Sequence, residues 1–318
     1  SASDLDRHAW ELIVVDDGSA DPETARLAAT ADRVVTLPAP ASGPAAARNA
    51  GAGVANGRWL AFVDADVLVH ADALRRMLDG LENSGAAAIF GSYDDMPAAR
   101  GIVSQYRNLL HHRVHQRNAG DVESFWAGCG AVERNAFNSV GQFDATRFRR
   151  PEMEDVDLGY RLRDAGYRIV LDPAILCTHL KRWTLTGMIA SDFSRRGLPW
   201  ARLLVERKML LNPRGLSLGA GERTSALLSF LAAASVLFAV LLQSRAAAMF
   251  AAATFVLFVA SNAPLFRWLG VKRGWRFAAS AMPLHFIYSV NAVAALTVGA
   301  LQGWFSPRSE PARYTRPR

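Results

Sequence analysis

Three long stretches without charged side chains follow one another in the last third of the sequence. Residues 224–244, 246–266 and 277–307 contain no Asp, Glu, Lys or Arg, and their one histidine is His285. Each reaches the length of about 20 residues that a helix needs to cross a bilayer. A buried helix of a water-soluble domain is rarely apolar on every side, and here the pattern occurs three times. The sequence therefore predicts an all-α transmembrane region over 224–307, with about three helices at 224–244, 246–266 and 277–303.

Basic segments border these stretches. Residues 194–223 carry an excess of arginine, and Ser194–Leu204 interleaves Arg195 and Arg196 with Trp200 and several leucines. This pattern predicts a basic helix at the membrane interface, followed by a linker. A water-soluble amphipathic helix is the alternative.

The charge rule for membrane proteins gives a conflicting result at the last stretch. Residues 194–223 and the basic link 268–276 should both be cytoplasmic, which suits two crossings between them. A third crossing would place the tail, 308–318, outside the cell. That tail is also basic, because it contains Arg308, Arg313, Arg316 and Arg318.

Charge and cysteine content narrow the class of protein. The net charge is +7 and the pI is about 9.9. We find no nucleic-acid-binding motif, and many cations border apolar segments, so we expect membrane lipids rather than nucleic acid as partners. Two cysteines, Cys129 and Cys177, make no disulfide framework and favour a reducing compartment.

The first two thirds of the chain alternate short apolar runs with helical patterns. This alternation predicts an α/β domain over residues 1–193 with a mostly parallel, doubly wound sheet. An i, i+3, i+4, i+7 stripe at Leu74, Met77, Leu78 and Leu81 predicts a helix that packs on the core. We expect strands at 11–17, 33–37, 59–66, 86–92, 125–131 and 167–171.

The apolar run that starts at Trp59 ends in Asp64-Ala-Asp66. Residues two apart on extended backbone point to the same face, so both carboxylates can point the same way. Two carboxylates so close together repel each other unless a cation lies between them. They suit Mg²⁺ or Mn²⁺, which often share carboxylate ligands with substrate phosphates. A solvated acid pair after a strand is the alternative.

Two further segments carry polar side chains at element ends. Asp16, Asp17 and Ser19 follow an apolar run, at the end of a strand where open α/β sheets bind ligands. Ordinary turn chemistry also accounts for Asp-Gly-Ser. Arg48 and Asn49 lie near the start of an alanine-rich helix, where they can face a diphosphate or solvent.

Acidic residues also gather at the start of a later helix. Glu154 and Asp155 lie in a group of four acids, which a helix dipole favours at this end. Asp155 lies four residues before Gly159, on a face beside the core face, where it can overlook a cleft. Capping is the alternative. Three histidines at 111, 112 and 115 suggest zinc, but no carboxylate or cysteine completes a ligand set.

Taken in order, these motifs resemble family-2 inverting glycosyltransferases of the glycosyltransferase A-type fold. The resemblance covers roughly residues 10 to 205, and its later part is similar to a bacterial membrane-attached subgroup. It rests on Val15-Asp-Asp-Gly-Ser19, Asp64-Ala-Asp66, Gly128-Cys-Gly130 and Glu154-Asp155 with Asp157-Leu-Gly-Tyr-Arg-Leu162.

The resemblance implies a role for each matching residue. Asp155 would be the catalytic base. Asp16 and Asp17 would hold the base and ribose of the donor, and Asp64 and Asp66 would bind Mn²⁺ or Mg²⁺ together with the donor diphosphate. We place Ser19, Arg48 and Glu154 in the donor site as well, and His179 near the diphosphate or the metal.

The expected activity is therefore transfer of a sugar from a nucleoside diphosphate donor with inversion. Membrane attachment favours a membrane-associated acceptor, such as a polyprenyl-linked glycan, a glycolipid or a surface polysaccharide. We expect a multi-pass protein of the bacterial inner membrane with a cytoplasmic catalytic domain. Polyprenyl phosphate itself as the acceptor is one rival. A membrane-anchored nucleotide-sugar-binding protein without catalysis is another.

One departure from the family pattern concerns the start of the chain. Family members have an apolar strand and a helix before the strand that ends in Asp16, and this strand normally lies in the middle of the sheet. The sequence starts too late to contain it. We therefore expect an amino-terminally truncated fragment or a misassigned start.

Overall fold

A computed structural model describes residues 3–20, 26, 28–210 and 220–305. The chain divides into two compact units. The α/β unit contains the described residues up to 98 together with 111–181, and the helical unit contains those of 99–110 and 182–308. The division cuts through helix α4 (Ile102–Arg117), so residues 99–110 belong with a helical region that lies much later in the sequence.

The described strands of the α/β unit form two sheets. A six-stranded sheet has the order β3-β7-β5-β8-β4, with β6 paired to β8, and β1 pairs with β2 in a separate sheet. The strands are β1 (Ile13–Asp16), β2 (Arg33–Thr36), β3 (Trp59–Val63), β4 (Val67–Val69), β5 (Ala88–Tyr93), β6 (Gly120–Asp121), β7 (Cys129–Glu133) and β8 (Ile169–His179).

The pairing directions are mixed. β1–β2 and β5–β8 are parallel, whereas β7 is antiparallel to both β3 and β5, and β8 is antiparallel to both β4 and β6. The predicted α/β class is confirmed. Two of the antiparallel pairs arise because β7 inserts between β3 and β5, which are themselves parallel to each other, and the other two arise because β4 and β6 pair with β8. Strand–helix alternation along the chain does not predict such an insertion.

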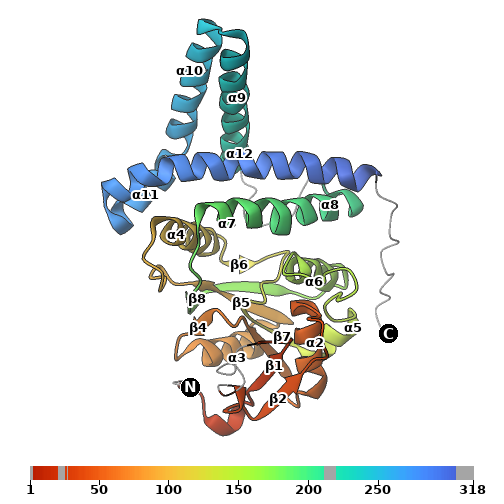
Figure 1. The fold of residues 1–318 in the computed structure, drawn as a ribbon. Coiled ribbons are helices and arrows are strands. Elements are labelled where there is room, and N and C mark those ends of the chain that lie inside the picture. The colour runs from red at the N-terminus through yellow and green to blue at the C-terminus, as the bar shows by residue number, and fades with distance from the viewer. Residues whose placement is uncertain (1–2, 21–25, 27, 211–219, 306–318) are drawn as a thin grey trace. The chain divides into compact units, whose positions relative to one another are not determined.

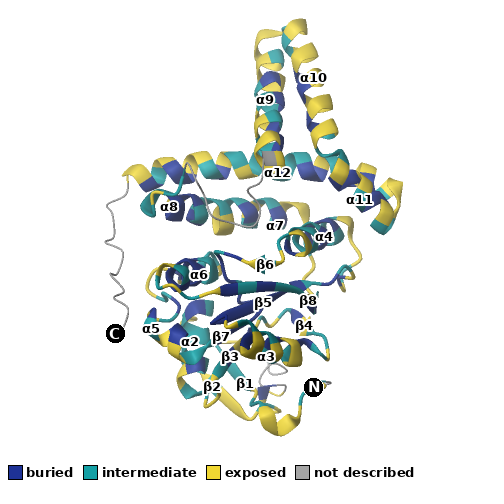
Figure 2. Ribbon diagram, turned by 180° about the vertical axis from the view of Figure 1, so that it is seen from behind, coloured by how far each residue is buried: buried dark blue, intermediate teal, exposed yellow. Residues whose placement is uncertain are grey.

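Helices cover both faces of the larger sheet. Figure 1 shows α3 (Ala73–Ser84) on one face and α6 (Glu154–Asp164) on the other. Met77 and Leu81 of the predicted stripe are buried on α3, and they pack with Ile89, Cys129 and Cys177 of the sheet. The dark blue strands of Figure 2 mark this core. The other described helices are η1 (Arg7–Ala9), α2 (Pro44–Val54) and α5 (Arg134–Ser139).

Two strands begin later than we expected. The predicted strand 125–131 is β7 at Cys129–Glu133, and Phe125–Gly128 forms a loop before it. The predicted strand 167–171 starts at Ile169 and continues to His179, because β8 changes its pairing partners along its length. The longer β8 matters for the site, since it delivers His179 to the edge strand β4.

The helical unit contains the first part of α4 and seven further elements. They are α7 (Leu185–Ala190), the π-helical η2 (Ser191–Gly197), α8 (Leu198–Glu206), α9 (Ala220–Leu242), α10 (Arg245–Ser261), α11 (Ala263–Arg273) and α12 (Trp275–Phe305). Its core joins Tyr106 and Leu109 of α4 to residues of α7, α11 and α12.

Two of these helices, α9 and α12, are long and apolar enough to cross a membrane. The helix that we expected over 246–266 is broken, because α10 ends at Ser261 and α11 turns away by 60°. The break coincides with Asn262 and with Pro264, whose ring nitrogen cannot donate a helical hydrogen bond. Counted as one bent span, α10 and α11 bring the total to three.

Candidate active site

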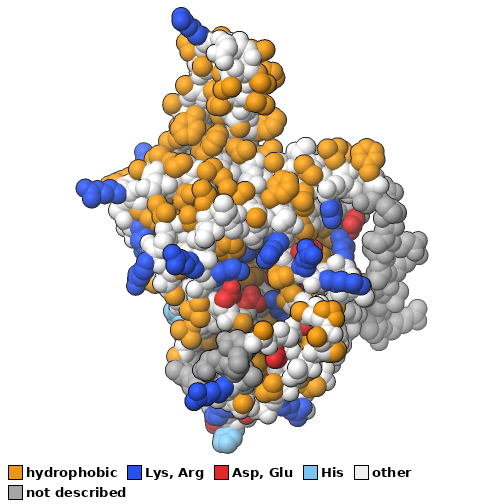
Figure 3. Space-filling view, in the orientation of Figure 1, with side chains coloured by type: hydrophobic (Ala, Val, Ile, Leu, Met, Phe, Trp, Pro, Cys, Tyr) orange, Lys and Arg blue, Asp and Glu red, His pale blue; other side chains and the backbone are white. Residues whose placement is uncertain are grey.

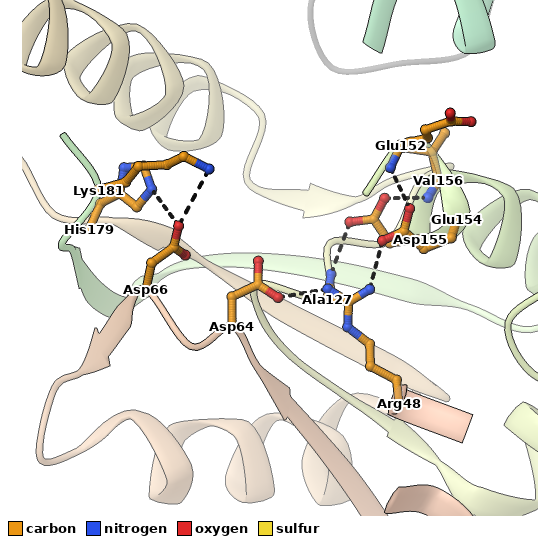
Figure 4. Close-up of polar contacts among 10 residues, drawn as sticks. All are labelled: Arg48, Asp64, Asp66, Ala127, Glu152, Glu154, Asp155, Val156, His179 and Lys181. Atoms are coloured by element: carbon orange, nitrogen blue, oxygen red, sulfur yellow. Dashed lines mark hydrogen bonds and ion pairs between the residues drawn. The ribbon is translucent and has the colours of Figure 1, made fainter. Parts of the chain in front are cut away.

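Asp64 and Asp66 lie in the short turn between β3 and β4. β3 already ends at Val63, so the two residues are not on extended backbone as we expected. The Asp64 backbone N–H donates to the Gly128 carbonyl at 3.2 Å, which ties the turn to the loop before β7. Figure 4 shows both carboxylates on the same side of the turn, where they have different partners.

Asp66 is paired with two basic side chains that follow β8. Its Oδ2 lies 3.8 Å from His179 Nε2 and 3.7 Å from Lys181 Nζ. The strand register explains the proximity, because His179 is opposite Val67 and the Leu180 N–H donates to the Asp66 carbonyl at 2.8 Å. His179 first, and Lys181 in addition, hold the pKa of Asp66 below its ordinary value.

Sequence reasoning missed Lys181, although the sequence contains a signal for it. His179 and Lys181 are two residues apart in the same way as Asp64 and Asp66. An acidic pair and a basic pair at the ends of two strands predict an ion-pair site only when the two strands are known to be neighbours in the sheet. The pairing of β4 with β8 was not predicted, because more than 100 residues separate the two strands.

Arg48 connects Asp64 to the acidic start of α6. Its guanidinium donates to Asp64 Oδ1 at 2.6 Å and to Glu154 Oε1 at 2.8 Å. The Arg48 side chain is 16% exposed, and burial alone would lower its pKa. Asp64, Glu154 and Asp155 outweigh this effect and raise the pKa of Arg48, so the cation is permanent. Glu154 is buried, and its Oε2 also accepts from the Glu152 N–H at 2.9 Å.

Asn49 has a structural role instead of facing a diphosphate. Its side-chain amide donates to the Phe143 carbonyl at 2.8 Å and its Oδ1 accepts from the Phe143 N–H at 3.0 Å. These two bonds use both ends of the amide and fix α2 beside the Phe143 ring. Arg48, the preceding residue, lies 5.4 Å from the centre of that ring.

Asp155 is the most perturbed acid of the described site. Its Oδ2 accepts from the Ala127 N–H at 3.2 Å and its Oδ1 from the Val156 N–H at 2.8 Å. Burial raises the pKa of Asp155 to about 7, Glu154 adds to this, and Arg48 opposes it. A carboxylate of this kind exchanges its proton near neutral pH, as a general base must.

The acidic turn after β1 is held by backbone hydrogen bonds. Asp16 Oδ1 accepts from the Ser19 N–H at 2.8 Å, and this bond holds the pKa of Asp16 below its ordinary value. Asp17 accepts from the Ser42 N–H at 2.7 Å and from the Gly43 N–H at 2.6 Å. Asp17 thus positions the loop that starts α2, the helix of Arg48. Whether Asp16, Asp17 and Ser19 also bind a nucleotide stays a prediction.

Two of the three histidines of α4, His111 and His115, pack with aromatic rings, and His112 Nδ1 bonds the Tyr93 carbonyl at 2.7 Å. His111 lies 4.4 Å from the Tyr93 ring centre and 3.9 Å from that of His115, and Tyr93 stacks on His179 at 4.3 Å. Burial lowers the pKa of His115 to about 4, and His115 Nδ1 bonds the Gly91 carbonyl at 2.9 Å. Through Tyr93, the cluster packs against the His179 ring. This packing role explains the histidines without zinc.

The carboxylates of the turn fit a divalent metal that shares its ligands with a substrate. In the described part of the chain, no three His, Cys, Asp or Glu side chains gather as a metal site. Mg²⁺ and Mn²⁺ are commonly held by one or two carboxylates, and substrate phosphates and water complete the coordination. Asp66, which is 40% exposed, and Asp64 match that donor set. His179 would add a nitrogen ligand that Mn²⁺ accepts more readily than Mg²⁺.

Comparison with known proteins gives the same family as these motifs. Residues 1–141 match the family model described as Glycosyl transferase family 2. The succinoglycan biosynthesis protein ExoO of Rhizobium meliloti (strain 1021) is 45% identical over 86 residues, which cover 26% of this chain and 25% of ExoO. The pre-mycofactocin glycosyltransferase of Mycobacterium tuberculosis (strain CDC 1551 / Oshkosh) is 32% identical over 188 residues, 56% of this chain and 39% of that protein. The chain thus matches less than half the length of either relative.

Comparison with solved structures gives matches of low sequence identity, two of which follow. Staphylococcus aureus TarS is 14% identical with a TM-score of 0.47, over 95% of this chain and 51% of TarS. GalNAc-T7, solved with UDP, GalNAc and Mn²⁺, is 15% identical with a TM-score of 0.43, over 62% of this chain and 44% of that one.

The family match agrees with the predicted glycosyltransferase A-type fold class. The matched region runs from the first residue to the glycine after α5, and it includes the turn after β1, Arg48 and the Asp64–Asp66 turn. Over residues 1–141, the chain is therefore similar to glycosyl transferase family 2.

Proposed function

We propose that this protein is an inverting glycosyltransferase that moves a sugar from a nucleoside diphosphate donor to a membrane-associated acceptor. The observation that carries the proposal is the joining of two motifs by Arg48. This one cation contacts Asp64 of the donor motif and Glu154, the neighbour of a carboxyl whose pKa is about 7. Arg48 would thereby hold Asp64 of the proposed donor site close to Asp155, the proposed base.

In this proposal, Asp155 is the catalytic base. The acceptor hydroxyl gives its proton to the Asp155 carboxylate as its oxygen forms the new bond to the anomeric carbon. The bond from that carbon to the diphosphate oxygen breaks in the same displacement, so the configuration inverts and no enzyme nucleophile is needed. The hydrogen bond from Ala127 to Asp155 fixes the direction in which the carboxylate faces.

The donor would be held by the remaining acids and cations. Asp64 and Asp66, with His179 as an additional ligand, would hold Mn²⁺ or Mg²⁺, which supplies positive charge for the departing diphosphate. Lys181, 3.7 Å from Asp66, would add a second positive charge at the same place. Asp16, Asp17 and Ser19 would contact the base and ribose, and Arg48 and Glu154 would line the donor site.

The acceptor class rests on the apolar helices. Two candidate spans, or three with the bent pair, would attach the chain to a membrane, where a lipid-linked glycan, a glycolipid or a growing surface polysaccharide is available as an acceptor. The apolar helices and the basic segments beside them favour the bacterial inner membrane, with the catalytic domain in the cytoplasm. ExoO, by its name a succinoglycan biosynthesis protein, supports a polysaccharide product.

Donor binding by the full-length protein in detergent tests this proposal. Nucleoside diphosphate sugars would be titrated with and without Mn²⁺, and transfer would be measured with the donor that binds. We expect Asp66→Ala to weaken the metal-dependent binding. We expect Asp155→Asn to leave binding nearly unchanged and to lower transfer by about 10²- to 10⁴-fold. Asp79→Ala, which removes an exposed carboxylate of α3, is the matched control.

Three results would contradict parts of the proposal. Transfer that survives Asp155→Asn would exclude Asp155 as the base. Binding that is independent of both metal and Asp66 would exclude the metal role of the turn. Donor binding without transfer to any lipid-linked or glycan acceptor would favour a nucleotide-sugar-binding protein, and transfer to polyprenyl phosphate alone would favour that narrower activity.

A further inference from the structure

Helices α9 and α10 form a hairpin whose open end rests on the middle of α12. The Ser225 hydroxyl lies 3.5 Å from that of Ser289, and Asn262, just after α10, contacts His285 at 2.9 Å. Phe258, near the end of α10, lies 5.3 Å from the Phe286 ring centre. These contacts join the second turn of α9 and the last turn of α10 to one short part of α12. Figure 1 shows α12 crossing this end of the hairpin.

The second half of α12 packs lengthwise against η2 and α8. A Cβ added at Gly197 would meet Ala295 at 2.4 Å, and one at Gly299 would meet Ala201 at 2.6 Å. Further along, a Cβ at Gly303 would meet Val205 at 3.1 Å. Small side chains at these positions let the two helices approach closely over two turns. The orientation of α12 in a membrane therefore determines that of η2 and α8.

η2 and α8 carry charged side chains that are energetically unfavourable in the hydrocarbon layer of a membrane. Arg195, Arg196 and Arg202 are exposed, and the Arg202 guanidinium donates to Gln302 on α12 at 3.1 Å. If α12 crossed the bilayer from Trp275, its residues after about position 290 would lie near or beyond the bilayer centre. Ala295 and Gln302 lie about 30 and 40 Å along the helix from Trp275, so the arginines packed beside them would have to pass through the hydrocarbon layer to its far side, and an exposed guanidinium is strongly disfavoured in that layer.

We infer that the α9–α10 hairpin alone crosses the bilayer and that α12 lies in the membrane plane beside α8. In this arrangement, Arg195, Arg196 and Arg202 reach the lipid headgroups. The exposed face of α12, which includes Val298, Leu301 and Trp304, borders the apolar layer. Tryptophan is favoured at that depth, because its ring is apolar and its N–H can reach water.

The hairpin has the length and the surface that a bilayer requires. The 23 residues of α9 extend about 34 Å, and the 17 residues of α10 extend about 25 Å, compared with a hydrocarbon layer of about 30 Å. Leu241 is 67% exposed and Met249 is 69% exposed. Figure 3 shows hydrophobic side chains over the visible face of the hairpin and a basic side chain at its tip. Arg245, which starts α10, would reach the far headgroups.

Two crossings also remove the conflict in the charge rule. With α12 in the membrane plane, the segments 194–223, 268–276 and 308–318 would all lie on one side. All three are basic, including the tail over 308–318, so all three agree with a cytoplasmic position. This inference concerns only how the chain enters the bilayer, and it does not depend on the proposed transfer activity.

Single cysteines in the full-length protein test the inference. Ser244→Cys marks the tip of the hairpin, Val271→Cys the end of α11, Phe305→Cys the end of α12, and Glu82→Cys the α/β unit. Each variant would be treated with a membrane-impermeant maleimide in right-side-out and in inside-out vesicles. The unchanged chain supplies the background, because Cys129 and Cys177 are buried. We expect Ser244→Cys to react only in right-side-out vesicles and the other three only in inside-out vesicles.

Each other pattern overturns the inference. Reaction of Phe305→Cys on the side opposite to Val271→Cys would mean that α12 crosses the bilayer. Reaction of Ser244→Cys on the same side as Glu82→Cys would mean that the hairpin does not cross. If either decisive variant is missing from the membrane fraction, Gln243→Cys and Gln302→Cys report the same two positions, because Gln302 lies beside Arg202 at the end of α12. Sugar transfer by the same vesicles gives a separate result on the proposed function.

Discussion

The acids of the site have different chemistry because they have different neighbours. Asp66 lies beside His179 and Lys181, and its pKa is lowered, so it stays ionised and suits a cation. Asp155 lies in a buried position beside Glu154, and its pKa is raised to about 7. Arg48 hydrogen-bonds Asp64 and Glu154, and its positive charge opposes the rise in the pKa of Asp155. In the proposed mechanism, Asp66 would therefore serve the metal and the diphosphate, and Asp155 would take the proton.

The raised pKa of Asp155 predicts a pH dependence. A general base works only as the carboxylate, so kcat/KM should rise with pH, reach half its maximum near pH 7 and fall about tenfold per unit well below it. The measurement is kcat/KM between pH 5 and 9 at saturating metal. A half-maximum near pH 4, the ordinary value for an aspartate, would show that Asp155 is not perturbed in the working enzyme or is not the base.

Removing the Arg48 cation should lower the stability of the fold and raise the pKa of Asp155. Arg48→Met leaves the buried Glu154 without its partner, which should lower the free energy of unfolding by about 3 kcal/mol. It also removes the cation that lowers the pKa of Asp155, so the half-maximal pH of kcat/KM should move upward. Thermal unfolding and the pH profile measure the two effects.

Arg48→Lys is the control for this prediction. Lysine keeps the charge but has no planar fork to reach Asp64 and Glu154 together, so an intermediate effect on both measurements is expected. A lower melting temperature of Arg48→Met with an unchanged pH profile would assign Arg48 a purely structural role.

These residue environments could be predicted only in part. Asp64, Asp66 and Asp155 can be predicted as candidates because they lie in short local patterns at element ends. The Arg48–Glu154 pair joins residues 106 positions apart, and nothing local in either segment reports it. The same holds for Tyr93 behind His179, whose stacking depends on how β5 and β8 pair.

Among helices and strands, the close packing of α6 decides where the base lies. Gly159 lies one turn after Asp155, and a Cβ there would be 2.3 Å from the Phe125 backbone nitrogen. Gly159→Ala should therefore lift α6 from the loop that contains Ala127, the donor to Asp155. We expect a loss of about 1–3 kcal/mol in stability and at least about a tenfold loss in kcat.

Gly53→Ala is the matched control for this change. Gly53 is also in a helix, α2, but no atom lies within 4 Å of an added Cβ. Alanine should be neutral there or stabilise the helix by up to about 1 kcal/mol. Thermal unfolding and transfer assays on both variants measure the difference. Equal behaviour of the two would mean that α6 does not depend on close contact at Gly159.

Hydropathy located the apolar helices but not their geometry. The segments 224–244 and 277–303 correspond to α9 and α12, whereas 246–266 is interrupted at Asn262. Hydropathy averages over a window, so it cannot detect a single polar residue and a proline that end one helix and start another. It also cannot distinguish a helix across the bilayer from one along it, because that depends on packing partners such as α8.

In the whole molecule, the two compact units differ from the predicted domain bounds at two places, because residues 99–110 and 182–193 belong to the helical unit. The sequence suggested one α/β domain up to residue 193, because the apolar stretches start later. In the structure, residues 102–110 of α4 pack in the helical core through Tyr106 and Leu109, and the same helix continues into the histidine cluster. A single helix shared by two cores has no composition signal, since each half looks like an ordinary helix.

Two separate cores predict two steps of unfolding. The α/β unit is organised around Met77, Ile89 and Cys177, and the helical unit around Tyr106, Leu269 and Leu284. All residues of the proposed donor site belong to the α/β unit. In detergent, donor with Mn²⁺ should therefore stabilise one calorimetric transition and leave the other in place.

The size of the shift follows from mass action. Donor at 100 times its Kd stabilises the unit that binds it by about 2.7 kcal/mol, which corresponds to roughly 5–10 °C for a unit of this size. Changing the detergent or adding lipid should move the other transition instead. Asp66→Ala, measured under the same conditions, should remove the donor shift while both transitions persist. A single transition that donor and lipid both move would show that α4 couples the two cores into one cooperative structure.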